Sequence, residues 1–253
     1  FPGWARKGER LETLGILRTA VEELPAMKDA FSRELVDLSS VQKHVLVERH
    51  LISREHAARS EGSGAVIERR QSFSIMLNEE DHLRMQSIRP GLQLKEAYEA
   101  LNALDSELER KLEYAFDPTL GYLTTCPTNL GTGLRASAML HLPGLVLSDQ
   151  IGPVLQAVNK IGLAVRGLYG EGTESLGNLY QISNQSTLGE SEETIISRLD
   201  RVISQVASHE QNAREKLMED DPSTCGLEAL LQCPVCLCVV CEPISLACGH
   251  TFC

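Results

Sequence analysis

The sequence predicts an α+β domain over residues 1–221, followed by a small cysteine-rich module over residues 222–253. Two observations predict this fold class. Apolar residues recur every three or four positions in several long segments, which is typical of amphipathic helices. Short β-rich segments lie between these helices without the regular alternation of a parallel α/β sheet. Because 42% of the 253 residues are apolar but only 4% are aromatic, we expect a mainly aliphatic core.

Two helical patterns lie in the first half of the chain. Residues 1–40 have helical spacing at four apolar positions, Leu14, Leu17, Val21 and Leu24. The stretch from Leu92 to Phe116 predicts a long amphipathic helix with one buried stripe.

Two more lie in the second half. A helix at about Leu147–Ile161 is expected to be interrupted or bent near Gly152-Pro153. The last helix begins near Ser191, a good N-cap, and extends into the charged stretch Glu210–Asp221. Its buried face is predicted to consist of Ile195, Leu199, Val202, Ile203 and Val206.

The clearest predicted strand is Phe73–Leu77, which alternates and would deliver Asn78 to a strand end. His44–Glu48 is also interpreted as a strand, and residues 59–72 as a polar loop or hairpin tip. Short β segments are expected near Gly121–Thr125, Leu163–Val165 and Asn178–Ile182.

The formal net charge of −11 argues against nucleic acid or an anionic membrane as a partner, because either would repel the chain. No apolar run reaches the roughly 20 residues of a membrane span. The chain also lacks a start resembling a signal peptide, which predicts a cytoplasmic protein. It begins at Phe1 rather than Met and stops within a cysteine motif at Cys253, so we expect both ends to be cut.

The first candidate site is Asn78-Glu-Glu-Asp-His-Leu-Arg84, directly after a predicted strand. Adjacent carboxylates on Glu79 and Glu80 can grip a planar guanidinium, and one of them can accept its proton. Arg84 adds the positive charge that phosphoryl transfer needs. Taken alone, such an acidic run is more often a solvated turn.

The second candidate is Cys126-Pro-Thr-Asn-Leu-Gly-Thr-Gly-Leu-Arg-Ala136. Backbone N–H groups of the Gly-x-Gly turn and the Arg135 guanidinium can face an anion, and the same setting can lower the pKa of a thiol. The alternative is an ordinary strand-to-helix turn with a buried thiol. A third, glycine-punctuated segment, Val165–Thr173, offers Arg166 and Glu171, although a surface hairpin would look the same.

Together, the three segments resemble the phosphagen (guanidino) kinase family in order and spacing. The sequence around these segments is most similar to the bacterial protein arginine kinases, and the resemblance covers most of residues 1–218. The stretches that carry it are Ser74–His82, Gly121–Asn129, Ala136–Pro143, Leu168–Glu171 and Gln181–Gln185. It implies a catalytic domain with an antiparallel sheet flanked by helices.

The resemblance also implies ATP-dependent phosphorylation of arginine within proteins, which marks them for a bacterial unfoldase-protease. Glu80 would be the catalytic base beside Glu79, Glu171 the opposing carboxylate, and Cys126 a thiolate against the substrate nitrogens. Three arginines would bind the nucleotide phosphates together with Mg²⁺, namely Arg84, Arg135 and Arg166. The family's N-terminal Ser-x-Arg-x-Arg segment and its small C-terminal domain are not found, so we expect the activity to be impaired.

Seven of the eight cysteines lie between Cys225 and Cys253, which suggests metal ligation rather than disulfides. The spacing resembles the first half of a RING finger, whose thiolates and imidazole suit tetrahedral zinc. The residues concerned are Cys233, Cys236, Cys248, His250 and Cys253. Three further ligands would lie beyond the chain, so Zn²⁺ is expected only if the module is completed.

Three alternatives to a protein arginine kinase therefore stay open. A completed RING would recruit a ubiquitin-conjugating enzyme and make the chain part of a ubiquitin ligase. The chain could also be a non-catalytic fragment or fusion. The nearest rival is a phosphagen kinase acting on a free guanidine, because loops that the sequence does not place help to set substrate choice.

Overall fold

The computed structural model describes residues 1–167 and 176–220, and it divides the chain into two compact units. Unit 1 comprises Phe1–Ile88 and Glu96–Gly133, and unit 2 comprises Arg89–Lys95 and the chain from Leu134 onward. Helices and antiparallel sheets occur in both units, so the predicted α+β class is confirmed. The predicted domain boundary at residue 221 lies at the edge of the described residues and stays a prediction.

Unit 1 is built on a four-stranded antiparallel sheet in which sequential strands are neighbours. The strands are β1 (Phe31–Glu34), β2 (Gly64–Ile67), β3 (Phe73–Leu77) and β4 (Leu83–Ser87). A separate two-stranded ribbon consists of β5 (Phe116–Asp117) and β6 (Gly121–Tyr122). The prediction of β3 is confirmed at both ends, and Glu68–Gln71 forms the predicted hairpin tip between β2 and β3.

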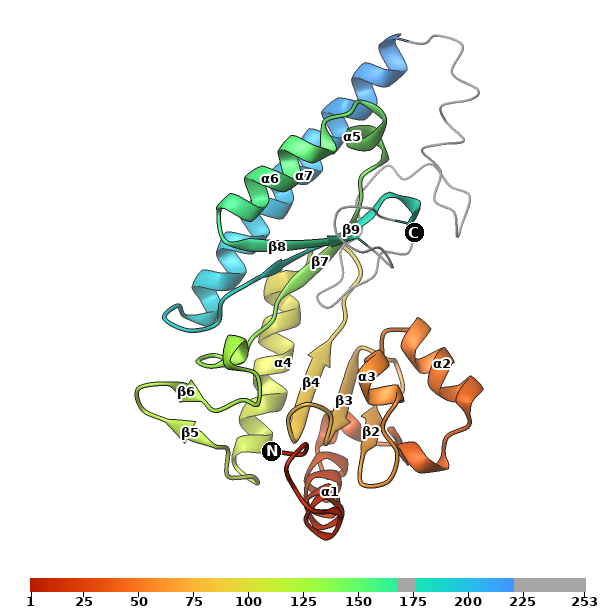
Figure 1. Cartoon of the computed structure of the whole chain (residues 1–253), viewed down its shortest axis with the longest axis vertical. Coiled ribbons are helices and arrows are strands. Elements are labelled where there is room, and N and C mark those ends of the chain that lie inside the picture. The colour runs from red at the N-terminus through yellow and green to blue at the C-terminus, as the bar shows by residue number, and fades with distance from the viewer. Residues whose placement is uncertain (168–175, 221–253) are drawn as a thin grey trace. The chain divides into compact units, whose positions relative to one another are not determined.

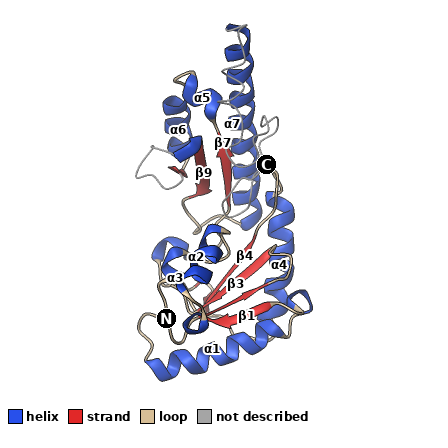
Figure 2. Cartoon of the chain, turned by 90° about the vertical axis from the view of Figure 1, so that its right-hand side faces the viewer, coloured by secondary structure: helices blue, strands red, loops and turns tan. Residues whose placement is uncertain are grey.

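Helices cover both faces of this sheet (Figure 2). On one face Val66, Ile75 and Leu77 pack against α1 (Lys7–Glu22) and α4 (Leu94–Glu109). On the other face Ala65 and Met76 pack with residues of α2 (Ser40–Glu48), α3 (Arg54–Ala57) and the segment between them. Alternate strand residues point to opposite faces, so both faces of β2 and β3 are apolar and buried. The central strands are thereby held from both sides.

The prediction of a strand at His44–Glu48 is wrong, because these residues belong to α2. Ser39 begins the helix with a capping box: its hydroxyl accepts a bond from the Gln42 N–H, and the Gln42 side chain accepts one from the Ser39 N–H. These two bonds satisfy N–H groups that a helix start leaves open. Val45 and Val47 supply β propensity, but the cap and the packing of Val47 on the sheet outweigh it.

Two further expectations for unit 1 need correction. Residues 59–72 are not all loop, since the short apolar run from Gly64 to Ile67 is the fully buried strand β2. The helix expected over Leu92–Phe116 is shorter, and Phe116 lies in β5. The helix in residues 1–40 is confirmed as α1, with Leu14, Leu17 and Val21 buried.

Unit 2 contains a three-stranded antiparallel sheet with β9 between β7 and β8. These strands are β7 (Ser137–His141), β8 (Leu163–Gly167) and β9 (Leu179–Asn184). The β segments expected near Leu163–Val165 and Asn178–Ile182 are confirmed, whereas β7 was not predicted. In Figure 1 the sheet lies beside α6 (Ile151–Lys160) and α7 (Glu192–Asp220); α6 contacts β8, and α7 contacts β7 and β9.

The helix expected over Leu147–Ile161 is confirmed for the most part as α6, whereas Leu147 belongs to the preceding short helix α5 (Pro143–Leu147). The break lies at Ser148–Gln150, where Asp149 has φ of 57°, and not at Gly152-Pro153. Pro153 falls in the first turn of α6, where its missing N–H costs no helical bond.

The predicted last helix is confirmed as α7. Ser191 accepts a hydrogen bond from the Thr194 N–H, and the predicted apolar face is buried. In the part of the chain that the structure describes, no helix is long and apolar enough to cross a membrane.

Candidate active site

The loop between β3 and β4 carries the first predicted constellation. Leu77 pairs with Leu83 across the hairpin, so residues 78–82 form its turn. Asn78 is buried with a left-handed backbone (φ 56°), and its Nδ2 donates to the carbonyls of Arg10 (2.9 Å) and Gly62 (2.8 Å). Asparagine tolerates this conformation better than most residues. The base of the turn is therefore fixed by a residue with no role of its own in the predicted chemistry.

Glu79, the first of the two predicted carboxylates, points inward and is only 3% exposed. Its Oε1 accepts from the Ser53 hydroxyl (2.8 Å), and its Oε2 accepts from Arg84 Nη1 (3.1 Å). Burial raises the pKa of Glu79, but the Arg84 charge, the Ser53 hydroxyl and the Glu80 backbone N–H outweigh it, so the pKa lies below its ordinary value. Glu79 is thus an ionised anchor for Arg84, whose own side chain is 48% exposed.

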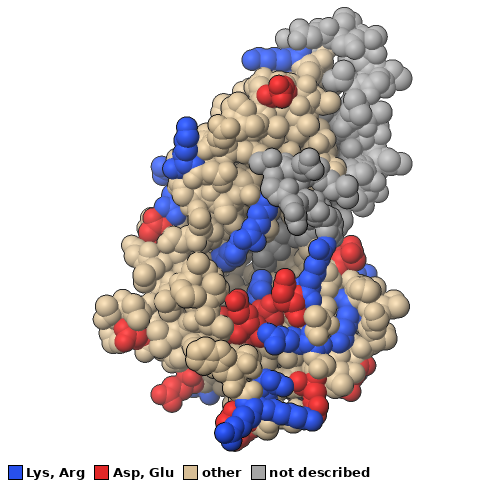
Figure 3. All heavy atoms as spheres, viewed as in Figure 1, with Lys and Arg blue, Asp and Glu red and all other residues tan. Residues whose placement is uncertain are grey.

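Glu80, by contrast, is exposed to solvent. Of the two adjacent glutamates, therefore, only Glu80 presents its carboxylate to solvent, and Glu79 is buried against Ser53 and Arg84. Figure 3 shows acidic and basic side chains close together on the face of unit 1 turned to the viewer. Glu80 has the accessibility that a proton acceptor for an incoming guanidinium needs.

The loop that carries Cys126 is closed by a contact between two glycines. Gly121 pairs with Gly131, and the Tyr122 N–H donates to the Gly131 carbonyl (2.8 Å). Gly121 has φ of 75°, and a Cβ there would lie 2.5 Å from the Gly131 oxygen. Only glycine fits this crossing.

Within this closed loop Cys126 is half-buried. Its Sγ lies 3.0 Å from the Thr128 hydroxyl, and it directly precedes a short 3-10 turn over Pro127–Asn129. The Cys126 loop is also joined to the carboxylate loop. The Thr125 N–H donates to Asp81 Oδ1 (2.6 Å), and the Thr125 hydroxyl donates to the Glu80 carbonyl (2.9 Å). The structure therefore brings together Glu79, Glu80, Arg84 and Cys126 within unit 1.

Two of the predicted phosphate-binding arginines belong to unit 2, where they lie on one face of its sheet. Arg166 in β8 is paired with Gln181, and the Gln181 side chain bonds the Ser137 hydroxyl (2.9 Å). Arg135 Nη2 lies 3.4 Å from the Ser183 hydroxyl. Residues two apart in a strand, and partners across strands, share a face. Both guanidiniums are exposed, so this face offers two positive charges.

A buried asparagine fixes the backbone next to Arg135. Asn184 Oδ1 accepts from the Ala136 N–H (2.8 Å), and its Nδ2 donates to the Leu134 carbonyl (2.9 Å). The segment on both sides of Arg135 is thereby bound to the end of β9. Sequence reasoning missed the supporting roles of Asn78, Asn184, Ser53 and Thr125, because each depends on a partner more than 15 residues away.

Several predicted site residues lie outside the described residues. They are Glu171 and the five predicted zinc ligands Cys233, Cys236, Cys248, His250 and Cys253. Among residues 1–167 and 176–220, no group of three or more His, Cys, Asp or Glu side chains is placed to hold a metal ion.

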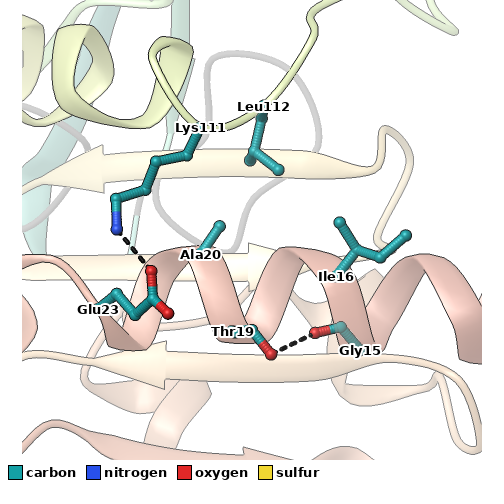
Figure 4. A pocket seen from close by; sticks show the side chains of 7 residues that line it. All are labelled: Gly15, Ile16, Thr19, Ala20, Glu23, Lys111 and Leu112. Carbon is teal, nitrogen blue, oxygen red and sulfur yellow. Dashed lines mark hydrogen bonds and ion pairs between the residues drawn. The ribbon is translucent and has the colours of Figure 1, made fainter.

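A hollow of about 410 Å³ on unit 1 lies away from these side chains (Figure 4). One wall comes from α1 and the other from Lys111 and Leu112, and Lys111 forms an ion pair with Glu23 (2.6 Å). None of the predicted site residues lines it.

Comparison with known proteins identifies the class to which this fold and these side chains belong. Residues 14–213 match the family model described as ATP:guanido phosphotransferase, C-terminal catalytic domain, and the chain belongs to this family. The match includes parts of both units and every described residue of the predicted site.

Among curated relatives, the chain is similar to proteins named protein-arginine kinase. It is 48% identical to that of Pelotomaculum thermopropionicum over 87% of this chain and 63% of the relative. It is 54% identical to that of Halothermothrix orenii over 73% of this chain and 53% of the relative. The chain thus spans between about half and two thirds of the length of these relatives.

Solved structures give the same family. A substrate-free duplicated taurocyamine kinase from Schistosoma mansoni matches 81% of this chain and 30% of its own, with a TM-score of 0.70 and 30% identity. A lombricine kinase matches 83% of this chain and 62% of its own, with a TM-score of 0.71 and 28% identity.

Proposed function

We propose that this chain transfers the γ-phosphoryl group of ATP to the guanidinium of an arginine in a protein substrate. The observation that supports the proposal is the contrast between the two glutamates after β3. Glu79 is buried and forms an ion pair with Arg84, whereas Glu80 is exposed to solvent. A guanidino phosphotransferase needs both an accessible carboxylate and a fixed positive charge. The relatives named protein-arginine kinase support a protein-bound arginine as acceptor.

In the proposed reaction, a guanidinium nitrogen attacks the γ-phosphorus. An N–P bond forms, the bond from phosphorus to the bridging oxygen breaks, and ADP leaves. Glu80 accepts the proton that the nitrogen loses. Cys126 and Glu171 would hold the guanidinium from other sides, so that nitrogen and phosphorus are aligned before transfer. Most of the rate enhancement in such a reaction comes from alignment and charge stabilisation.

Arg84, Arg135 and Arg166 are proposed to bind the ATP phosphates. The described part of each site fits this role, because all three guanidiniums are exposed and two of them share one face of a sheet. Mg²⁺ is usually held by one or two carboxylates together with substrate phosphates and water. In that mode the phosphates held by the three arginines would supply ligands to the ion, and the ion would neutralise phosphate charge.

The cysteine-rich tail carries a separate proposal, supported by its sequence motif alone. Residues 222–253 are proposed to be the start of a RING-like module that binds Zn²⁺ and a ubiquitin-conjugating enzyme once completed. Zinc content of the purified chain, measured by atomic absorption, tests whether the five ligands bind metal as they stand. A cytoplasmic location also stays a prediction.

The deciding experiment is a phosphotransfer assay with Glu80→Gln. The purified chain is incubated with Mg-ATP and either an arginine-rich protein or free arginine, and acid-labile phosphate is scored. Glu80→Gln removes the proton acceptor while keeping its shape, so we expect a loss of roughly 10²–10⁴-fold. Glu107→Gln, at an exposed position of α4, is the matched control and should leave the rate unchanged.

Label on the protein that Glu80→Gln abolishes supports a protein arginine kinase. Label on free arginine alone supports the free-guanidine alternative. A folded chain that labels neither substrate contradicts the proposed activity.

A further inference from the structure

We propose that Thr125 and Asp81 are positioning residues that fix the Cys126 thiol relative to Glu80, an inference that rests on the proposed function for its catalytic consequence. Neither residue was singled out for its own chemistry in the sequence. Both lie in unit 1, where the loop between β3 and β4 meets the loop between Gly121 and Gly131.

The junction consists of two hydrogen bonds that leave the same residue. The Thr125 N–H donates to Asp81 Oδ1 at 2.6 Å, a charge-assisted bond of short length. The Thr125 hydroxyl donates to the backbone carbonyl of Glu80 at 2.9 Å. Glu80 directly precedes Asp81, and Cys126 directly follows Thr125. The pair of bonds therefore sets two candidate catalytic residues next to one another, although 46 positions separate them in the sequence.

Each loop is braced separately on its far side. The carboxylate loop is held at its base by the buried Asn78, which bonds the carbonyls of Arg10 and Gly62. The cysteine loop is held by the Gly121–Gly131 crossing. Because neither brace connects the two loops, their mutual register depends on contacts between them, and Thr125 supplies two of these.

The chemistry makes this register matter. A thiol and a proton acceptor that contact the same planar guanidinium must approach it from fixed directions, and a displacement of about 1 Å can cost roughly 10²-fold in rate. Thr125 does not need to touch the substrate to have this effect. It acts through the two residues next to the junction, which is why its role is positioning and not catalysis.

The test compares three substitutions in the full chain. Thr125→Val keeps the β-branched shape and the backbone N–H but removes the hydroxyl that bonds the Glu80 carbonyl. Thr125→Ser restores that hydroxyl. Thr119→Val is the matched control, because Thr119 is an exposed threonine in the turn between β5 and β6. Circular dichroism and thermal melting confirm that each variant is folded.

Two readouts separate positioning from a merely structural role. We expect Thr125→Val to lower kcat by roughly 10–100-fold while KM for ATP changes less than about twofold, and Thr125→Ser to recover most of the loss. We also expect iodoacetamide to alkylate Cys126 at least about threefold faster in Thr125→Val, since freeing the loop exposes the thiol. The tryptic peptide spanning residues 112–135 contains Cys126 and none of the other seven cysteines, so mass spectrometry isolates this rate.

The alkylation rate of Cys126 can be measured whether or not the chain has kinase activity. If the wild-type chain transfers no phosphate but Cys126 alkylation still accelerates in Thr125→Val, the positioning of the thiol stands and the proposed function falls. If Thr125→Val is folded and matches Thr119→Val in both kcat and alkylation rate, the junction does not position the two residues and the inference is overturned.

Discussion

Units 1 and 2 each contain a buried glutamate paired with an arginine, yet the two pairs differ in the exposure of the arginine. Glu79 and Glu210 are equally buried, with side chains that are 4% exposed. Arg84 is 48% exposed, whereas Arg214 is only 13% exposed. A buried anion that holds an accessible cation presents a charge to a ligand, but a pair buried on both sides can only hold the fold together.

The surroundings of the second pair agree with a structural role. Glu210 accepts from the N–H groups of Gly144 (2.7 Å) and Leu145 (2.9 Å) at the start of α5 and from Arg214 Nε (2.5 Å), and Arg214 donates to the His141 carbonyl (3.2 Å). A Cβ at Gly144 would lie 2.8 Å from Arg214 Cγ. This clamp joins α7 to α5 and β7. The comparison teaches that arginine exposure, and not the ion pair itself, separates a candidate site from a fold contact.

The largest effect on stability should come from Glu210→Gln. The change leaves Arg214 buried without its charged partner and weakens the bonds to α5, which typically costs about 3 kcal/mol for a broken buried pair. Urea unfolding at neutral pH measures it. Glu215→Gln, at an exposed position of the same helix, should be within about 0.5 kcal/mol of wild type. If Glu210→Gln is as stable as wild type, the Glu210–Arg214 pair does not hold the fold of unit 2 together.

The complementary change in unit 1 is Arg84→Ala, for which we expect a large loss in activity. A loss in stability is also expected, because the buried Glu79 carboxylate is left without its charged partner. If Arg84 stabilises phosphate charge, kcat/KM for ATP should fall by roughly 10²–10³-fold. Arg84→Lys keeps the charge but not the planar fork, so an intermediate loss is expected. Glu79 retains its bond from Ser53 in both variants. If Arg84→Ala lowers the melting temperature but the folded variant keeps the wild-type kcat/KM for ATP, Arg84 has only a structural role, like Arg214.

The sequence predicted the parts of this comparison unevenly. The turn that carries Glu79 and Glu80 leads to Arg84 in β4 and follows a strand of high β propensity, so local patterning was enough to place it. The opposite orientations of the two glutamates depend on Ser53, which lies 26 residues earlier in the chain. Such a contact has no local signal. The Glu210 clamp was missed for the same reason, since its partners Gly144 and Leu145 are more than 60 residues away.

The fold shows the same limit. Long periodic segments such as α7 were predicted correctly, and so was the strand β3. The error at His44–Glu48 arose because a short apolar run with valines is compatible with either a helix or a strand. The Ser39 capping box and packing on the sheet favour the helix. Strand β7 was missed because its residues were interpreted only through their likeness to a family.

The smallest predicted effect concerns a histidine in each unit and appears only in acid. Burial lowers the pKa of His56 in unit 1 and of His141 in unit 2 from 6.5 to about 4, and the Arg214 charge adds to the shift at His141. In the unfolded chain these two histidines therefore bind protons near pH 6.5, whereas in the folded chain they do so only near pH 4. Stability contributed by each neutral histidine is present above the unfolded pKa and is lost as the pH falls through this window. At about pH 5 each histidine should cost about 2 kcal/mol relative to neutral pH.

Urea unfolding at about pH 7 and about pH 5 measures this loss, above the range where most carboxylates titrate. His56→Gln cannot be protonated, and it should remove about 2 kcal/mol of the difference between the two pH values whatever it does to stability at neutral pH. The exposed His44 gives the matched control, because His44→Gln should leave the pH dependence as in wild type. If His56→Gln and His44→Gln behave alike, His56 is not held neutral in the folded chain. The acid sensitivity of unit 1 between pH 7 and pH 5 must then come from another group, such as His50, whose pKa burial also lowers to about 4. Glu79 would not supply it, because its lowered pKa places its loss of stability at lower pH.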